Sequence, residues 1–357
     1  MGGGARAALA AARRRRGAAH VRRRGPAGGA ARAGRRRAAG AGRGRRADGA
    51  AMTPSDAFGF SGEAVRTAHD IRADWAATGL RGALYARNVD TGEDLGFDVH
   101  VPYALASVSK LPLALVVLDL VAAGALDPSM PVDLVPGTMT PGPTGAALFR
   151  HPSRIALEDL LVLMLSVSDN AAADAVFALV PPEQVTATLQ GWGCEGIVVR
   201  HPMRRLYEAA AAVAPDDPTL ALELAVRATT DGGGHVLPTL DVAAATSGTA
   251  AGLVALVERI WTDAVSVTAA TARLRELLGH QVRQRMGAEL AADAVAVSSK
   301  TGTFLNLRHE AGMVTTSTGD RIAVAALTAS TVAAATQPEA DRAIGRAARA
   351  AVDVLRV

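Results

Sequence analysis

The sequence predicts an α/β (α+β) fold in which both ends of the chain build one antiparallel sheet flanked by helices, while the middle forms an all-α lobe. Three observations support this prediction. Apolar residues alternate with a period of two at 80–99 and again at 294–328. Between these regions they recur every three to four positions, as on helices. Turn-forming residues separate neighbouring strand-like runs. We expect the chemistry to lie in a cleft between the two lobes.

The first third of the chain predicts a helix, a hairpin and a second helix. Ser61 is suited to cap a helix that runs to Ala77. Strand-like runs follow at 80–89 and 94–99, and Asp90-Thr91-Gly92 joins them as a hairpin turn. Ser107 opens a strongly apolar helix that ends near Ala123, with Gly124 as its C-terminal cap. The region 128–145 is rich in Pro and Gly and predicts a loop.

The rest of the chain predicts several helices, then strands, then one last helix. The expected helices of the middle are 157–165, 170–179, 182–190, 220–228, 249–262 and 270–278, with a helix breaker at 231–234. The expected strands are 294–301, 311–316 and 322–328, the last two joined by a turn at 317–320. Residues 338–355 form the final amphipathic helix.

Residues 1–51 differ from the remainder in composition. They hold 15 of the 38 basic residues and a single acid, Asp48, and they lack apolar periodicity. We expect no fold in this segment and one folded domain over 52–357. Three interpretations stand: a basic arm for nucleic acid or anionic lipid, a targeting segment, or untranslated upstream sequence with Met52 as the true start. We favour the third, because no hydrophobic stretch suits a signal peptide.

The composition of residues 52–357 excludes several classes of protein. Here 23 basic and 33 acidic residues give a net charge of −10, so overall charge does not predict nucleic-acid binding. No run approaches the roughly 18 apolar residues of a membrane span. The one cysteine, Cys194, excludes an intramolecular disulfide and a thiolate zinc cluster, and the eight histidines form no metal-binding pair. We expect no metal and no other cofactor, a small-molecule substrate as partner, and, since no signal peptide is visible, the cytoplasm as the favoured compartment.

The two lysines stand out among the basic residues, because the other 36 are arginines. Arginine keeps its proton in any protein environment, whereas a buried lysine can lose its proton and act as a base. Lys110 belongs to Ser107-Val108-Ser109-Lys110, and Lys300 begins Lys300-Thr301-Gly302-Thr303. The positions of both lysines in such motifs indicate sites where arginine cannot do the chemistry.

Three short motifs could carry that chemistry. Ser107 and Lys110 would lie on one face of a helix start, where the helix dipole favours developing negative charge and Lys110 could take the serine proton. Ser168-Asp169-Asn170 stands between two helices, where its short polar side chains could serve an active site. The structural alternative is that they cap the N-terminus of the second helix. Lys300-Thr301-Gly302 ends a strand, where the lysine could present a positive charge and the glycine would allow a substrate backbone to approach. The structural alternative is that this segment simply leads from the strand into a turn.

In this order the three motifs resemble those of the class A β-lactamase and penicillin-binding-protein superfamily, whose signature is Ser-x-x-Lys, Ser-Asp-Asn and Lys-Thr-Gly. The resemblance covers most of residues 60–355. It implies that Ser107 is the acylated nucleophile, Lys110 its proton acceptor and Ser168 a proton relay. It also implies that Asn170 holds a substrate amide, that Lys300, Thr301 and Thr303 receive a carboxylate beside Gly302, and that the Ser107 and Thr303 N–H groups form the oxyanion hole. Arg308 would support the same carboxylate.

The sequence departs from the class A pattern at the step that removes the acyl group. Class A enzymes carry a water-positioning glutamate in Glu-x-x-Leu-Asn after Ser-Asp-Asn, but 198–211 lacks such a segment, and 215–238 looks like an insertion. The candidate replacements are Glu208, His201 and Glu310. His309 and Glu310 could equally form a structural ion pair.

The resemblance thus implies a serine hydrolase that forms an acyl-enzyme on Ser107 with a lactam, amide or ester bearing a carboxylate. β-Lactam breakdown and antibiotic resistance are the associated roles. The alternatives are a penicillin-binding carboxypeptidase or transpeptidase, an esterase, or a non-catalytic ligand-binding member of the fold.

Overall fold

The computed structural model describes residues 61–215, 217–227 and 234–357. The N-terminal segment 1–51, Ala228 and residues 231–233 of the expected helix breaker lie outside this range.

The central element is a five-stranded antiparallel sheet in the order β2-β1-β10-β9-β8. Its strands are β1 (Leu80–Asn88), β2 (Asp94–Phe97), β8 (Ala296–Phe304), β9 (Leu307–Thr315) and β10 (Arg321–Ser330). The first strand pairs with the last along its whole length, from Leu80 opposite Ser330 to Asn88 opposite Ile322. The predicted antiparallel sheet built from both ends of the chain is therefore confirmed.

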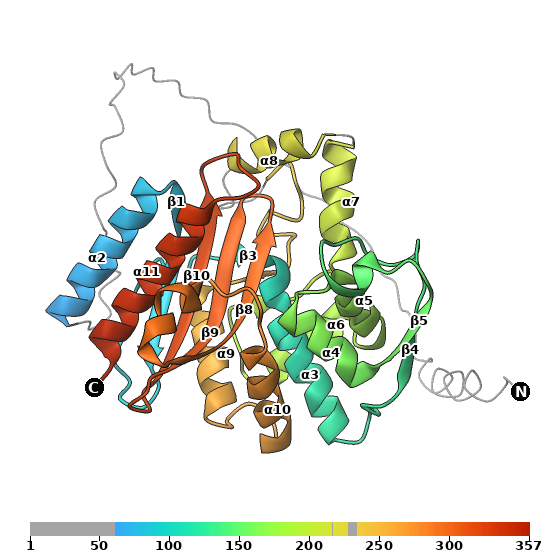
Figure 1. Cartoon of the computed structure of the whole chain (residues 1–357), viewed down its shortest axis with the longest axis horizontal. Coiled ribbons are helices and arrows are strands. Elements are labelled where there is room, and N and C mark those ends of the chain that lie inside the picture. Colours follow the sequence, from blue (N-terminus) through green and yellow to red (C-terminus); the bar gives the residue numbers. More distant parts are fainter. Residues whose placement is uncertain (1–60, 216, 228–233) are drawn as a thin grey trace, which may run out of the picture. The chain divides into compact units, whose positions relative to one another are not determined.

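Two terminal helices cover one face of this sheet, as Figure 1 shows: α2 (Gly62–Ala77) and α11 (Pro338–Leu355). Ser61 caps α2 as predicted, since its hydroxyl accepts from Ala64 N at 3.1 Å. Trp75 of α2 is 1% exposed, and its indole N–H donates to Ala343 O at 3.2 Å. Strand residues alternate between the two faces, so that Leu84 packs in the core under these helices and Ala83 in the larger core on the other side.

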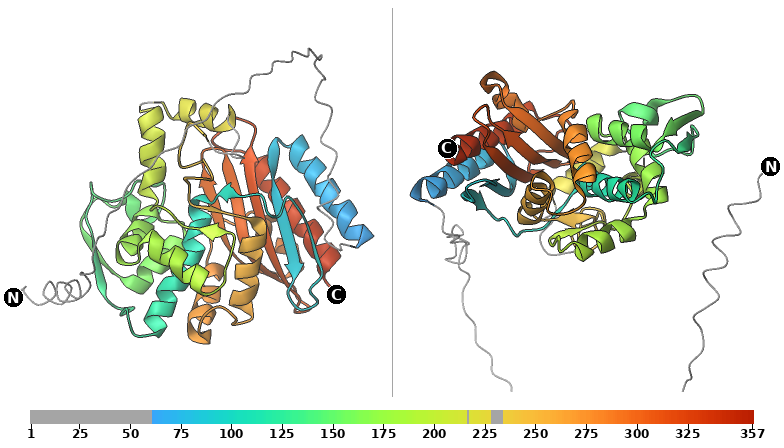
Figure 2. Two further views of the ribbon diagram at one scale, coloured as in Figure 1. Left: turned by 180° about the vertical axis from the view of Figure 1, so that it is seen from behind. Right: turned by 90° about the horizontal axis from the view of Figure 1, so that it is seen from below.

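The other face of the sheet meets the helical lobe (Figure 2). A 3₁₀ turn, η3 (Ala106–Ser109), leads into α3 (Lys110–Ala122), whose residues 110–118 are all buried. The further helices are α4 (Leu157–Ser166), α5 (Asn170–Leu179), α6 (Pro182–Gly191), α7 (Arg204–Val213), α8 (Pro218–Arg227), α9 (Ala250–Trp261) and α10 (Thr268–Gly279). None of the described helices is both long and apolar enough to cross a membrane.

Several boundaries differ from the prediction for identifiable reasons. The α-helix begins at Lys110, because Ser107 belongs to the preceding 3₁₀ turn. Helix α7 was not predicted, since it is short, begins with two arginines and buries only Leu206 and Ala209. Strand β9 begins four residues before the predicted start. Its first residues include buried polar side chains, which hid the strand from an apolar pattern. The expected loop contains a two-stranded sheet of β4 (Pro131–Leu134) and β5 (Ser153–Ala156).

Three shorter segments form a small second sheet in the order β3-β7-β6. They are β3 (Tyr103–Ala104), β6 (Ile197–Val198) and β7 (Ser247–Gly248). Strand β3 leads directly into the turn that carries Ser107, so its pairing with β7 anchors the nucleophile segment from one side.

Candidate active site

The segment around Ser107 is held in a strained backbone conformation. Ala106, directly before it, has φ of 46°, in the left-handed region that non-glycine residues rarely adopt. The N–H of Lys110 donates to Ser107 O, as in a 3₁₀ turn, where side chains three residues apart lie above one another. Ser107 is 9% exposed and Lys110 fully buried, so the turn brings a nearly enclosed hydroxyl and a buried amine to one side.

Lys110 Nζ contacts the Ser-Asp-Asn segment. It donates to Ser168 O at 2.7 Å and to Asn170 Oδ1 at 2.8 Å, and Ser168 Oγ lies 3.3 Å away. Burial lowers the pKa of Lys110 to about 7, although the charges of Asp169 and Asp174 act in the opposite direction. A neutral amine has two hydrogens for the two shorter contacts and keeps a lone pair that can accept a proton.

Within Ser168-Asp169-Asn170, the middle residue has a structural role and its two neighbours contact the lysines. Asp169 caps α5 by accepting from Ala171 N and Ala172 N, and it also accepts from Ala146 N at 2.6 Å. Ser168 has φ of 60°, another left-handed residue, and its hydroxyl faces both lysines. The capping role that the sequence offered as an alternative thus belongs to the middle residue, and its neighbours remain available to the site.

Lys300 reaches the same hydroxyl from the sheet. Its Nζ lies 3.1 Å from Ser168 Oγ and donates to Thr301 O at 2.9 Å. Burial, and then the positive charge of Lys110, hold the pKa of Lys300 well below its usual value. The structure therefore brings both lysines of the chain, from β8 and from α3, to the single hydroxyl of Ser168.

Strand β8 and the Ser107 turn are in close contact, and Gly302 makes this possible. A Cβ at position 302 would lie 2.8 Å from Leu105 O and 3.0 Å from a methyl of Val108. The missing side chain of Gly302 therefore leaves room for the segment that carries Ser107. The sequence alone predicts that it leaves room for a substrate backbone instead.

His309 braces the same segment and is not placed to activate water. Its Nδ1 accepts from Thr328 N at 2.9 Å, so its Nε2–H donates to Ala104 O at 2.8 Å. Burial lowers its pKa to about 4, which keeps the ring neutral. The suggested ion pair with Glu310 is wrong, because the two side chains leave the strand on opposite faces and bind different groups.

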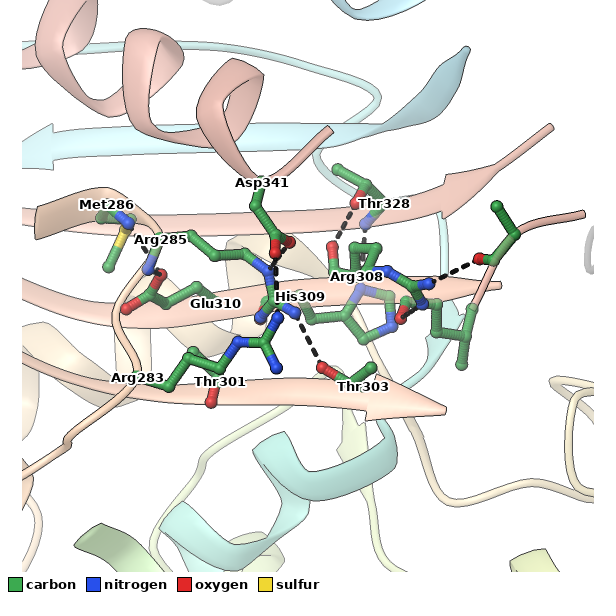
Figure 3. Close-up of polar contacts among 12 residues, drawn as sticks. Arg283, Arg285, Met286, Thr301, Thr303, Arg308, His309, Glu310, Thr328 and Asp341 are labelled. Carbon is green, nitrogen blue, oxygen red and sulfur yellow. Dashed lines mark hydrogen bonds and ion pairs between the residues drawn. The ribbon is translucent and has the colours of Figure 1, made fainter. Parts of the chain in front are cut away.

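Glu310 is a structural anchor, since its buried carboxylate accepts from three neighbours, and Figure 3 shows it beside Arg285 and Met286. They are Arg285 N at 2.6 Å, Met286 N at 2.8 Å and the Ser299 hydroxyl at 2.5 Å. Burial raises the pKa of this carboxyl, and the hydrogen bonds partly offset that rise. These contacts leave the carboxylate occupied, which argues against the suggested role in activating water.

The guanidinium of Arg308 is not available to bind the substrate carboxylate, contrary to the expectation from the sequence. Its guanidinium donates to four main-chain carbonyls, those of Leu305, Leu307, Ala334 and Ala335, and the residue is 2% exposed. These bonds fix the β8–β9 turn to the segment before α11.

Arg285 is the cation that the structure places behind Thr303, and no pattern in the sequence indicates this role. It is 2% exposed and donates to the Thr303 hydroxyl at 2.7 Å, to His309 O at 3.0 Å and to Asp341 at 2.5 Å (Figure 3). Thr303 itself is exposed. On the same face the buried Thr301 hydroxyl accepts from Gln281 at 3.0 Å.

Asn170 lies within the site beside Lys110, whereas Glu208 lies at the surface. The Asn170 amide donates to Tyr207 Oη at 2.8 Å and to Pro141 O at 3.2 Å, and its oxygen accepts from Lys110. Glu208, the next residue on α7, lies at the surface in an ion pair with Arg205 at 2.9 Å. This ion pair argues against Glu208 as a replacement for the missing glutamate, and Tyr207 is a site neighbour that the sequence did not predict.

His201, the third candidate replacement, is also committed to the main chain. Its Nε2 accepts from Thr246 N at 3.1 Å, and its Nδ1 lies 3.1 Å from Pro202 O. Among the residues that the structure describes, no group of three or more His, Cys, Asp or Glu side chains could hold a metal ion.

The fold and the convergence of these motifs define a serine β-lactamase or penicillin-binding-protein-like protein. The chain belongs to the β-lactamase enzyme family, whose model matches residues 66–355. It is 44% identical over 292 residues to the β-lactamase regulatory protein BlaB of Streptomyces cacaoi, a match that covers 78% of this chain and 94% of the relative.

Solved structures share the fold at low sequence identity. A β-lactamase from Sphaerobacter thermophilus is 20% identical with a TM-score of 0.65, covering 81% of this chain and 96% of its own. PBP-A is 17% identical, also with a TM-score of 0.65, over 81% of this chain and 95% of its own. The predicted superfamily is therefore confirmed.

Proposed function

We propose that this chain is a serine hydrolase that forms an acyl-enzyme on Ser107 with a lactam, amide or ester carrying a nearby carboxylate. One observation carries the proposal: two fully buried lysines, the only lysines of the chain, meet at Ser168 Oγ beside the turn of Ser107. Burying two amines together has a large free-energy cost, and groups perturbed in this way cluster at functional sites.

The proposed acylation uses Lys110, Ser168 and two main-chain N–H groups. Neutral Lys110 takes the proton of Ser107 as Oγ bonds to the substrate carbonyl carbon. The main-chain N–H groups of Ser107 and Thr303 would stabilise the resulting oxyanion. Ser168, between the two amines, passes a proton to the leaving nitrogen or oxygen as its bond to carbon breaks.

The substrate carboxylate would bind at the end of β8. Lys300 and the hydroxyls of Thr301 and Thr303 are the proposed contacts, and each of these hydroxyls accepts a hydrogen bond and so retains its own hydrogen for the substrate. Arg285, in place of Arg308, supplies positive charge behind Thr303.

We expect deacylation to be slow. The carboxylates of Glu208 and Glu310 are occupied elsewhere. Burial raises the pKa of the Tyr207 phenol, so it keeps its proton at neutral pH and is a poor base. The acyl-enzyme would then persist, and nitrocefin turnover would fall far below that of efficient β-lactamases.

A second candidate function is a ligand-responsive protein that uses acylation or binding as a signal. The 44% identical relative is named a β-lactamase regulatory protein, and slow deacylation suits a protein that reports the presence of a β-lactam. During incubation with benzylpenicillin, intact-protein mass tests acylation of Ser107, which both functions allow, and the amount of hydrolysed product separates them, because a hydrolase releases more than one product molecule per chain.

In that experiment we expect an adduct on the wild type that forms within minutes and decays slowly, and no adduct on Ser107→Ala. A fluorophosphonate probe serves as a second acylating agent. If neither reagent labels Ser107, the hydrolase proposal fails, and the non-catalytic ligand-binding protein becomes the better description. Rapid regeneration of free enzyme would overturn the expected slow deacylation.

A further inference from the structure

The Asn170 side chain has no free hydrogen-bonding hydrogen in this structure. Its amide nitrogen carries two hydrogens, and its two acceptors are Tyr207 Oη at 2.8 Å and Pro141 O at 3.2 Å. Its oxygen accepts from Lys110 Nζ at 2.8 Å. A substrate carbonyl that binds this amide must therefore replace one of the two acceptors.

Two features place Tyr207 beside Asn170. Its ring packs edge-on against Phe304 of β8, with centroids 6.0 Å apart and an interplanar angle of 72°. The start of its helix is fixed to α5, because the half-buried Asp174 accepts from Met203 N at 2.6 Å and from Arg204 N at 2.8 Å. The hydroxyl thus lies between the helical lobe and the end of the strand that carries Lys300.

We propose that Tyr207 is a specificity-determining residue whose hydroxyl occupies the position of a substrate side-chain amide. The inference rests on the proposed acylation of Ser107 and deepens it. The preferred acyl donors are compact molecules without an amide at this position, and donors with an acylamino side chain bind only after the phenol moves away from Asn170.

Pro141 O is the less favourable acceptor to displace. It belongs to the main chain, and this constraint outweighs the greater length of its bond, which is 0.4 Å longer than that to Tyr207. A phenol on a helix surface can rotate about its side-chain torsions, whereas a main-chain carbonyl moves only with its loop. The competition therefore lies between the substrate and the tyrosine.

The test compares two β-lactams that differ in the acylamino group: benzylpenicillin, which has it, and 6-aminopenicillanic acid, which lacks it. Acylation of Ser107 is followed by intact mass in the wild type, in Tyr207→Phe and in the control Tyr85→Phe. Tyr85 also loses a hydrogen-bonded hydroxyl in this control, but its partner is Asp94 on β2.

We expect Tyr207→Phe to accelerate acylation by benzylpenicillin by roughly 3- to 10-fold, the range of one hydrogen bond. The gain should appear in the apparent dissociation constant of the encounter complex, with 6-aminopenicillanic acid and Tyr85→Phe unchanged. A fall in both rates would overturn the inference, because the hydroxyl would then be needed to orient Asn170. An unchanged ratio of the two rates would also overturn it.

Failure of the proposed function gives a different result. If fluorophosphonate and both penicillins leave every variant unlabelled, the acyl-enzyme proposal fails and the role of Tyr207 fails with it. If fluorophosphonate labels Ser107 but Tyr207→Phe gives no benzylpenicillin adduct, only the role of Tyr207 is overturned.

Discussion

At Lys110 two physical effects act in opposite directions on one proton. Complete burial favours the neutral amine, while Asp169 and Asp174 favour the ammonium, and the resulting pKa is about 7. Only the neutral form can accept the Ser107 proton. We therefore expect the second-order rate of fluorophosphonate labelling to be low in acid and to rise with pH through about 7.

Lys110→Arg is the matched variant, because a guanidinium retains its positive charge but cannot give up its proton at this pH. Its labelling should be slower by about 10²- to 10⁴-fold, the usual contribution of a general base. A variant that labels at the wild-type rate, or a wild-type rate that is independent of pH, would show that another group takes the proton.

Glu310 offers a contrast between a structural and a catalytic carboxylate. Glu310→Ala removes the acceptor of two N–H groups and one hydroxyl, so we expect unfolding to become easier by roughly 3 kcal/mol. Glu310→Gln keeps one accepting oxygen and should cost only about 1 kcal/mol. Denaturant unfolding measures both values.

The pH dependence of labelling distinguishes the two roles of Glu310. If Glu310 is only structural, the labelling rate of Glu310→Gln should rise with pH around the same midpoint, near 7, as that of the wild type. The pKa of Lys110 is set by burial and by the charges of Asp169 and Asp174. A displaced midpoint would indicate that Glu310 takes part in the proton transfer.

Single residues could be predicted where their chemistry is visible in the composition. The two lysines stood out because arginine cannot replace a base. Arg285 and Tyr207 were missed, since each acts through a contact between segments distant in the sequence, and one arginine among 36 carries no local signal. Arg308 was misassigned for the same reason: its partners are main-chain carbonyls, two of them in a segment some 26 residues away.

At the level of elements, the contact between β8 and η3 positions the nucleophile. Gly302→Ala would place a methyl 2.8 Å from Leu105 O and 3.3 Å from the Cβ of His309, so the strand and the turn must separate. Because a displacement of about 1 Å can cost 10²-fold in rate, we expect labelling of Ser107 to fall by about that factor while the fold persists.

Gly191→Ala is the control for this change. Position 191 ends α6 and has no atom within 4 Å of an added Cβ, so alanine should leave labelling unchanged and stabilise slightly, as in most helices. Circular dichroism confirms folding of both variants. Normal labelling of Gly302→Ala would mean that the turn does not depend on this contact.

Elements were predicted well where burial is periodic and poorly where it is not. The hairpin β1–β2, helix α5 and helix α11 follow their apolar patterns closely. Helix α7 is short, begins with two arginines and buries few residues, and β9 carries three buried polar residues after Leu307, so neither start was predicted. These two elements carry Tyr207 and the Arg308–Glu310 group, which makes the site less visible in the sequence than the fold.

For the whole molecule, the described residues form two hydrophobic clusters that span the folded domain from end to end. These clusters draw their members from Ala64 to Leu355, and the first strand is paired along its length with the last. Because the composition of residues 1–51 predicts no fold, we expect a chain that begins at Met52 to melt within about 1 °C of the full chain.

The two chains should differ in charge-dependent binding instead. Removing 15 arginines and one aspartate changes the net charge from +4 to −10, so only the full chain should be retained on an anionic heparin column at low salt. Fluorophosphonate labelling of Ser107 should proceed at the same rate in both, since every residue of the site lies between 105 and 341. A lower melting temperature or slower labelling of the shortened chain would assign residues 1–51 a direct part in the folded hydrolase domain.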